Sequence, residues 1–358
     1  MKLLKKLVTA AIAGCMALSL SACSDTTWVY EFDGEKIPSG LYIGYTISAY
    51  SQVSQQEGYD ANIKDIFKQT INGKSTDQWI KDTAKQECAM YAVYEKKFNE
   101  LGLSFSEDDI SALDSSLKSN WDSLGTVYEK NGVSKASYRK LLESSKRESM
   151  IFSKYYGEGG LEEVKKEDLL AHFKENFASV NIFRMALYTG SDLTDEQKKS
   201  NEKTKTDSEK YLKMLNEEGK TFGETYDQYY HDVLGTTHDA ENDQDVITED
   251  SESTTWVKKN DTSRYSEKVL STIFNELKPD GDAMIIADTN YYYIVKRYDV
   301  TKDEKNFDEM RESVLYDIKG DDFKKMAEGW ASEMKTVVNN AAVSRYKPKH
   351  IDLTTDTK

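Results

Sequence analysis

Residues 164–188 read VKKEDLLAHFKENFASVNIFRMALY, and the pattern of apolar side chains changes within this stretch. Residues 164–176 have the spacing of a short helix. From residue 179 to residue 188, apolar and polar side chains alternate, as in a β-strand with one buried face. The chain is therefore predicted to pass here from a helical region into a region that contains a sheet.

The residues before this point predict a mainly helical domain over residues 28–176. It opens with a β-hairpin over residues 28–37, whose turn is Asp33-Gly34. Helix starts are predicted at Ser75, Ser106 and Ser134. Apolar residues at helical spacing follow each of these serines, so at least three helices are expected.

The residues after this point predict a small α/β domain over residues 177–302. Its expected elements are a strand at 179–188, a polar helix at 194–215, a strand at Trp256, a helix at 267–277, and strands at 283–287 and 291–300.

A long amphipathic helix is then predicted within residues 303–340, followed by a tail over residues 341–358. The α/β domain offers little surface to cover this helix, so we expect it to pack on the N-terminal helices. The predicted fold is α+β and mainly helical. One helical domain is built from N- and C-terminal segments, and the α/β domain is inserted between them.

The first 22 residues have the pattern of an export signal. A basic start with three lysines precedes an apolar run over residues 7–20, which is too short to span a bilayer. The next residues, Leu20-Ser21-Ala22-Cys23, resemble the lipobox of bacterial lipoproteins, in which the cysteine receives a diacylglycerol. This resemblance predicts a signal peptide at 1–22, a lipidated Cys23 and an anchor linker at 23–27. The alternative is an ordinary secretory signal with a chance cysteine.

The charge of the chain limits its partners. The 358 residues include 63 acidic and 48 basic side chains, for a net charge of −15. Loss of the three leader lysines would leave 45 basic residues and a net charge of −18. Nucleic-acid binding is disfavoured, because it depends on clustered Lys and Arg. Cys88, the one thiol left after Cys23, lies in an apolar helical stretch and is predicted to be a small buried residue.

Several short motifs resemble the bacterial extracytoplasmic foldases of the PrsA and SurA type, a parvulin-like peptidyl-prolyl isomerase family. They match the family patterns "VNGEKI", "AKKLGI", "GLTEEEF" and "VTDEEVKKYYEEN" at residues 32–37, 80–103, 131–138 and 164–176. The order of the motifs is the stronger part of the likeness. The resemblance implies a SurA-N-like helical chaperone domain around a parvulin domain, and clients that are unfolded exported polypeptides.

The residues that would form the parvulin site depart from the family pattern. Arg184-Met185-Ala186-Leu187 stands where parvulins have Arg-His-Ile-Leu, and Tyr293 stands where they have the second histidine. Tyr265 and Val269 are rough equivalents of the apolar pair that holds the substrate proline. The chain's four histidines fall at neither position; they are His172, His231, His238 and His350. A degenerate site with weak or lost isomerase activity is therefore expected, with an active isomerase as the alternative.

The acidic segment 239–252 carries seven acids and no base. Its acids match five positions of a calcium-binding loop, at Asp239, Glu241, Asp243, Asp245 and Asp250. However, Gln244 stands where that loop needs glycine, so a solvated loop is preferred to weak calcium binding. We predict no cofactor and no metal.

Taken together, these features predict a lipid-anchored chaperone or foldase on the outer face of the bacterial cell membrane. A peptide- or glycan-binding surface lipoprotein is the alternative from a different class.

Overall fold

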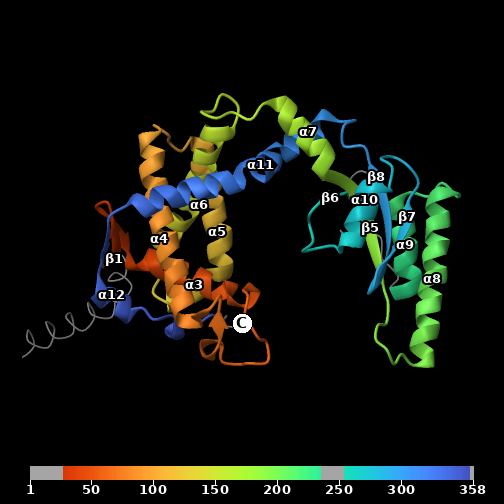
Figure 1. Ribbon diagram of the computed structural model, residues 1–358, viewed down its shortest axis with the longest axis horizontal. Helices are drawn as coiled ribbons and strands as arrows, with labels where there is room; N and C mark the ends of the chain where they lie inside the picture. Colours follow the sequence, from red (N-terminus) through yellow and green to blue (C-terminus); the bar gives the residue numbers. More distant parts are fainter. Residues whose placement is uncertain (1–26, 235–253, 355–358) are drawn as a thin grey trace, which may run out of the picture. The chain divides into compact units, whose positions relative to one another are not determined.

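The computed structural model describes residues 27–234 and 254–354, which form two compact units (Figure 1). The first, here called the helical unit, combines the residues up to Glu163 with those from Lys319 onward. The second, here called the α/β unit, runs from Val164 to Ile318. This arrangement confirms the predicted mainly helical α+β fold, in which N- and C-terminal segments share one domain. Cys23, the leader and the acidic segment 239–252 lie outside the described residues.

Helices that start at predicted caps build the helical unit. They are α3 (Ser39–Gln52), α4 (Thr76–Glu100), α5 (Glu107–Lys130) and α6 (Lys135–Tyr156). The side-chain oxygens of Ser75, Ser106 and Ser134 each accept a hydrogen bond from the backbone N–H three residues later. These bonds satisfy donors that the first turn of a helix leaves free. Smaller elements complete this part of the chain: η1 (Val53–Gln55), η2 (Ile66–Lys68), β3 (Thr70–Ile71) and β4 (Lys74–Ser75).

A small antiparallel sheet joins the two ends of the helical unit. The predicted hairpin forms β1 (Trp28–Phe32) and β2 (Glu35–Pro38). Asp33 and Gly34 have φ values of 50° and 94°, as a tight hairpin turn requires. On its other side β1 pairs with β9 (Thr336–Val338), which lies just over 300 residues later in the chain.

The segment predicted as a tail is folded as far as the structure describes it. It contains α12 (Asn340–Arg345) and η4 (Pro348–His350). Tyr346, Ile351 and Leu353 then pack against a buried cluster of Ile43, Ile47 and Val133. Residues 340–354 are therefore part of the helical unit, and the description of 341–358 as a tail was wrong for the residues up to 354. Three separated apolar side chains gave no periodic signal in the sequence.

The long helix α11 (Glu304–Glu333) belongs to both units. Its C-terminal half lies across α4 and α6, and Phe323 is only 1% exposed there (Figure 1). The Phe323 ring is parallel to Tyr94 at 6.4 Å and edge-on to Phe152 at 5.4 Å. The expected packing of the C-terminal helix on the N-terminal helices is therefore present, but only from Lys319 onward.

The α/β unit contains four strands and several helices among its described residues. The helices are α7 (Lys166–Asn176), α8 (Asp195–Asn216), α9 (Phe222–Tyr229), the π-helical turn η3 (Tyr230–Leu234) and α10 (Glu267–Asn275). The strands are β5 (Phe177–Ala186), β6 (Thr255–Lys258), β7 (Met284–Ala287) and β8 (Tyr291–Tyr298). Each lies within a few residues of its predicted position.

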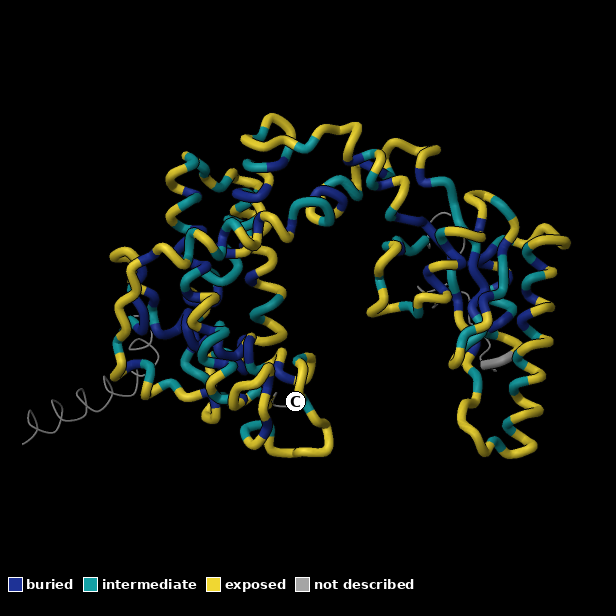
Figure 2. The backbone as a smooth tube through the Cα atoms, viewed as in Figure 1, coloured by how far each residue is buried: buried dark blue, intermediate teal, exposed yellow. Residues whose placement is uncertain are grey.

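These strands form one antiparallel sheet in the order β6-β5-β8-β7. Helix α10 covers one face through a cluster that includes Val269 and Ile273. Helices α8 and α9 cover the other face through Tyr211 and Phe222. Figure 2 shows the buried residues concentrated in the strands, whereas α8 is exposed along much of its length. The sheet therefore has an apolar cluster on each side.

The boundary between the units differs from the predicted one. Helix α7 was assigned to the helical domain, but it belongs to the α/β unit, where Phe173 contacts Trp256 and Phe307. The first half of α11 joins the same unit through Phe307. The reason is that Phe173 of α7 packs on Phe177 of β5, on Trp256 of β6 and on Phe307 of α11. Spacing along the sequence does not reveal contacts between segments so far apart.

An ion network ties three elements of the α/β unit together. The Asp317 carboxylate on α11 accepts a hydrogen bond from His172 Nε2 on α7 at 2.7 Å. It also pairs with the Lys258 ammonium on β6. Burial by itself raises the pKa of Asp317, but the hydrogen bonds from Lys258 and His172 outweigh burial and lower the pKa below its usual value.

We expect Asp317→Asn to lower the stability of the α/β unit at pH 7 by about 1.5 to 3 kcal/mol, because it removes a charged hydrogen-bond acceptor. A carboxylate with a lowered folded-state pKa stabilises the fold above its unfolded pKa of about 3.9, and loses this effect as the pH falls through the folded value. Urea unfolding from pH 7 to pH 3 should therefore show the two proteins converging in acid. Asp308→Asn, on the exposed face of α11, is the matched control and should change little.

Candidate binding groove

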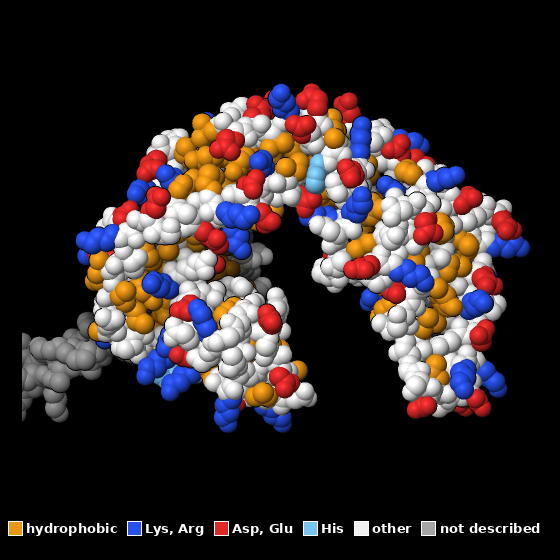
Figure 3. Space-filling view, viewed as in Figure 1, with side chains coloured by type: hydrophobic (Ala, Val, Ile, Leu, Met, Phe, Trp, Pro, Cys, Tyr) orange, Lys and Arg blue, Asp and Glu red, His pale blue; other side chains and the backbone are white. Residues whose placement is uncertain are grey.

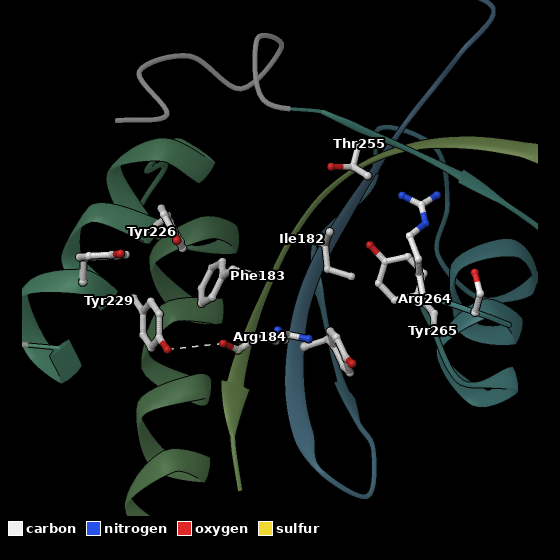
Figure 4. Close-up of a pocket in the computed structure, with 11 residues that line it drawn as sticks. Ile182, Phe183, Arg184, Tyr226, Tyr229, Thr255, Arg264 and Tyr265 are labelled. Atoms are coloured by element: carbon white, nitrogen blue, oxygen red, sulfur yellow. Dashed lines mark hydrogen bonds between the residues drawn. The ribbon is translucent and has the colours of Figure 1, made fainter. Parts of the chain in front are cut away.

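An open groove of about 750 Å³ lies on the α/β unit. The edge of β5, beyond the residues that pair with β6, forms its floor. On one face of the sheet α9 and η3 form the first wall, and on the other face the loop before α10 and Tyr293 of β8 form the second (Figure 4). Its lining residues are Ile182, Phe183, Arg184, Tyr226, Tyr229, Tyr230, Thr255, Ser263, Arg264, Tyr265 and Tyr293. A volume of this size is typical of sites for small ligands or a few side chains of a peptide.

The first wall is a cluster of aromatic rings from α9 and β5. Phe183 stacks on Tyr229 at 5.2 Å and contacts Tyr226 at 5.5 Å. Tyr226, Tyr229 and Tyr230 follow one another at helical spacing, which places them on one side of α9. The Tyr229 hydroxyl donates a hydrogen bond to the Arg184 carbonyl at 3.4 Å (Figure 4). This bond joins the wall to the floor.

The second wall is Tyr265 with its neighbour Arg264. Ser266 caps α10 by accepting the Val269 N–H, so Tyr265 is held immediately before the helix begins. The Tyr265 ring lies edge-on to Tyr293 of β8, with 6.3 Å between ring centroids. The two walls therefore carry tyrosine rings on opposite faces of the sheet, one on each side of the β5 edge.

Two guanidinium groups add positive charge to the groove. Arg264 pairs with Asp261 and donates to the Trp256 carbonyl at 2.9 Å, so its guanidinium already has partners within the protein. Arg184 lies 4.8 Å from the centre of the Tyr291 ring, and no carboxylate of the described residues forms an ion pair with it. The groove therefore offers one cation to an incoming carboxylate or carbonyl.

The groove contains phenols rather than an acid–base pair. Burial raises the pKa of Tyr265 and of Tyr293 above the usual value of about 10. Both hydroxyls are therefore protonated at neutral pH and can donate hydrogen bonds. None of the lining residues within the described part of the chain is His, Cys, Asp or Glu. This arrangement suits binding better than proton transfer.

The structure brings together three of the five predicted site residues: Arg184, Tyr265 and Tyr293. Met185 is 2% exposed and faces the α8–α9 side of the sheet, with Tyr211. Val269 is fully buried in the core beneath α10. Neither residue lines the groove.

Strand register explains the error at Met185. Arg184 of β5 is paired directly with Tyr293 of β8, and Met185 with Tyr292. Paired residues share a face of the sheet and successive residues alternate. Of the two predicted neighbours, Arg184 thus shares a face with Tyr293, and Met185 lies on the opposite face. A shift of one residue moves a side chain to the opposite face.

Sequence reasoning missed the wall made by Tyr226, Tyr229 and Tyr230. Their spacing of three and four residues was a usable signal for one helix face. It did not indicate what that face would meet, because Tyr265 comes 35 residues after Tyr230.

Other candidate residues do not form a second site within the described residues. His172 pairs with Asp317, and His231 lies 3.6 Å from Asp227. Cys88 is fully buried, and burial raises the pKa of its thiol. No group of three metal-ligating side chains occurs in residues 27–234 and 254–354, and no helix there has the length and apolar content to cross a bilayer. His238 and the calcium-loop candidates lie outside these ranges.

Comparison with known proteins returns similar structures but no similar sequences. No protein-family model matches the chain, and no curated protein matches it. The foldase protein PrsA from Streptococcus pneumoniae is 16% identical over 81% of this chain and 99% of its own, with a TM-score of 0.38. PrsA from Lactococcus lactis is 12% identical over 90% and 99%, with a TM-score of 0.35. PrsA from Bacillus subtilis is 14% identical over 93% and 96%, with a TM-score of 0.30. With TM-scores below 0.5, these likenesses carry no argument about activity.

Proposed function

We propose that this chain is a membrane-anchored extracytoplasmic foldase of the PrsA type, whose clients are unfolded exported polypeptides. The α/β unit holds extended client segments in the tyrosine groove, and its prolyl-isomerase activity is weak or lost. The observation that carries the proposal is the composition of that groove: five tyrosines and two arginines line it, without a residue suited to acid–base catalysis at neutral pH.

Tyrosine-lined grooves are suited to varied polypeptide segments. A tyrosine ring gives a large apolar contact at a small loss of conformational entropy, and its hydroxyl can bond to a backbone carbonyl. The walls are separate elements on opposite faces of the sheet, so an extended chain can lie along the β5 edge with Tyr229 on one side and Tyr265 on the other (Figure 4). Arg184 favours segments that carry a carboxylate beside an apolar residue.

The side chains at the two histidine positions account for the proposed loss of isomerase activity. The resemblance places the two histidines of a parvulin site at Met185 and Tyr293. Met185 is buried on the α8–α9 face of the sheet, whereas Tyr293 lies on the other face. A thioether and a protonated phenol cannot replace a pair of imidazoles that share protons.

The proposed anchor is Cys23. The first described residue, Thr27, is already tied to the helical unit, because its carbonyl accepts hydrogen bonds from the Ser39 N–H and hydroxyl at 2.7 and 2.8 Å. Four residues from Cys23 to Thr27 span at most about 14 Å. A lipid on Cys23 would therefore keep the helical unit next to the membrane.

Cys23→Ala should abolish incorporation of a labelled fatty acid and release the protein from the membrane fraction of an expressing bacterium. Cys88→Ala is the matched control, because its thiol is buried, and it should leave both properties unchanged. The proposed anchor would be contradicted if Cys23→Ala still incorporated the labelled fatty acid, whether or not it left the membrane fraction.

Tyr265→Ala should weaken binding of an unfolded client by about 30-fold, the usual effect of removing an aromatic anchor at a binding site. Fluorescence anisotropy with a labelled, permanently unfolded polypeptide measures this change. Tyr265→Phe keeps the ring and should lose much less affinity. Tyr188→Ala is the control outside the groove, since that ring is 52% exposed on the same unit.

Suppression of aggregation of a model protein by the wild type, reduced by Tyr265→Ala, supports the chaperone role. If instead one defined peptide or glycan strongly raises the melting temperature and aggregation is unaffected, the chain is a ligand-binding surface lipoprotein.

A further inference from the structure

The C-terminal segment of the helical unit is basic in an otherwise acidic protein. Between Glu333 and Asp352 the sequence contains no Asp or Glu, while the whole chain has a net charge of −15. The cations of this stretch are Lys335, Arg345, Lys347 and Lys349, and His350 comes directly after Lys349. Three of these four cations fall within residues 345–350, here called the basic segment.

The fold exposes these cations by burying the residues between them. Pro348 is buried, and Tyr346 and Ile351 pack toward Ile43 and Ile47. Arg345, Lys347, Lys349 and His350 are all exposed, and none of them forms an ion pair with a described residue. Figure 3 shows a group of Lys and Arg side chains at the lower left of the helical unit, where the C-terminal segment runs in Figure 1. The segment is therefore a fixed row of cations.

The basic segment borders a small hollow that is rich in hydrogen-bond donors. Arg345, Lys347 and His350 line a cavity of about 150 Å³ together with Lys130 and Asn131 at the end of α5, whose side chains already donate to the Thr354 and Asp352 carbonyls. Asp352, the next carboxylate along the chain, accepts hydrogen bonds from the Thr354 N–H and hydroxyl at 2.9 and 2.6 Å. Guanidinium and ammonium groups around one hollow match a phosphate group.

The segment also lies close to the point where the described chain begins. Asn339, the N-cap of α12, donates from its side chain to the Trp28 carbonyl and from its backbone to the Val29 carbonyl, both at 2.9 Å. The six residues of α12 span about 9 Å, so the basic segment starts roughly that far from β1. A lipid on Cys23 would be tethered within about 14 Å of Thr27.

We propose that the basic segment binds the anionic phospholipid headgroups of the membrane that holds the anchor. Cations near such a surface are attracted to it, and the attraction fades within a Debye length of about 8 Å. The rest of the acidic chain is repelled by the same surface. Contact through residues 345–350 therefore orients the helical unit, with this face toward the lipid. The nearness of the membrane rests on the proposed lipidation, whereas the anion site does not.

The test measures vesicle binding by the whole polypeptide from residue 24, without its lipid. Vesicles of phosphatidylcholine with phosphatidylglycerol should bind it, and vesicles of phosphatidylcholine alone should not. Each Lys or Arg near an anionic surface contributes about a fivefold factor, so R345Q/K347Q/K349Q should lower the partition coefficient about a hundredfold. K198Q/K199Q/K205Q removes the same charge from exposed positions on α8 and should change binding less than twofold.

If the two triple variants lowered the partition coefficient equally, the proposal would be overturned, because net charge alone would then explain binding. Binding to soluble polyphosphate without binding to the anionic vesicles would also overturn it, since a dissolved polyanion would be the ligand. Circular dichroism melting checks that each variant is folded. Tyr265→Ala should bind the vesicles as the wild type does. A negative result in the vesicle test would therefore not affect the groove proposal, and a negative result in the client-binding test would not affect the proposal for the basic segment.

Discussion

A short proline-containing peptide should isomerise in the presence of this chain at nearly its uncatalysed rate. The barrier to rotation is about 18 to 20 kcal/mol, and an isomerase lowers it by binding the twisted amide more tightly than the planar one. Losing an oriented polar group from such a site typically reduces the rate by 10²- to 10³-fold. Because the two positions at which the family has histidines hold Met185 and Tyr293, we expect at least that reduction relative to an ordinary parvulin.

A protease-coupled cis/trans assay with peptides of differing residues before proline measures this rate. The set includes peptides with Glu before proline, because Arg184 on the groove floor can attract the Glu carboxylate. Tyr265→Ala serves as the internal control: any residual catalysis that belongs to the groove should fall with it. Turnover comparable to that of an ordinary parvulin would refute the proposed loss and favour the active isomerase.

Phe323→Ala should destabilise the helical unit by about 3 to 5 kcal/mol, the usual effect of removing a fully buried aromatic ring. The ring lies between Tyr94 of α4, Phe152 of α6 and Trp330 of its own helix. No solvent reaches it, so the variant leaves a cavity among three helices. Hydrogen exchange of amides in α4 and α6 should speed up accordingly.

Phe307→Ala is the matched control for this prediction. Phe307 belongs to the same helix and is equally buried, at 4% exposed, but it packs on Phe173 in the α/β unit. The same substitution should therefore speed exchange in α7 and β5 and leave α4 unchanged. If Phe323→Ala left the helical unit as stable as before, the conclusion that N- and C-terminal segments together form that unit would be wrong.

These two residues also show why the division of α11 escaped prediction. The helix has apolar positions along its whole length, from Phe307 to Trp330. Its first half buries some of them against α7, and its second half buries others against α4 and α6. A pattern of apolar positions records that a face is buried, but not which partner buries it.

The groove shows the same limit at the level of single residues. The sequence pointed to the ends of the first and last strands and to Tyr265, and all three regions do meet. The choice between Arg184 and Met185 depended on the pairing of β5 with β8. Pairing is set by contacts between strands more than 100 residues apart, so composition near residue 184 could not decide it.

The sequence by itself determined the local structure: the Asp33-Gly34 turn, the serine caps of α4, α5 and α6, and the strands of the α/β unit. Each depends on hydrogen bonds or alternation within a few residues, which the residue types dictate. Only the tertiary structure decided that β9 pairs with β1, that residues 340–354 pack on α3, and that five tyrosines from four segments line one groove. These contacts join residues that are far apart in the chain, where burial rather than local preference selects the partner.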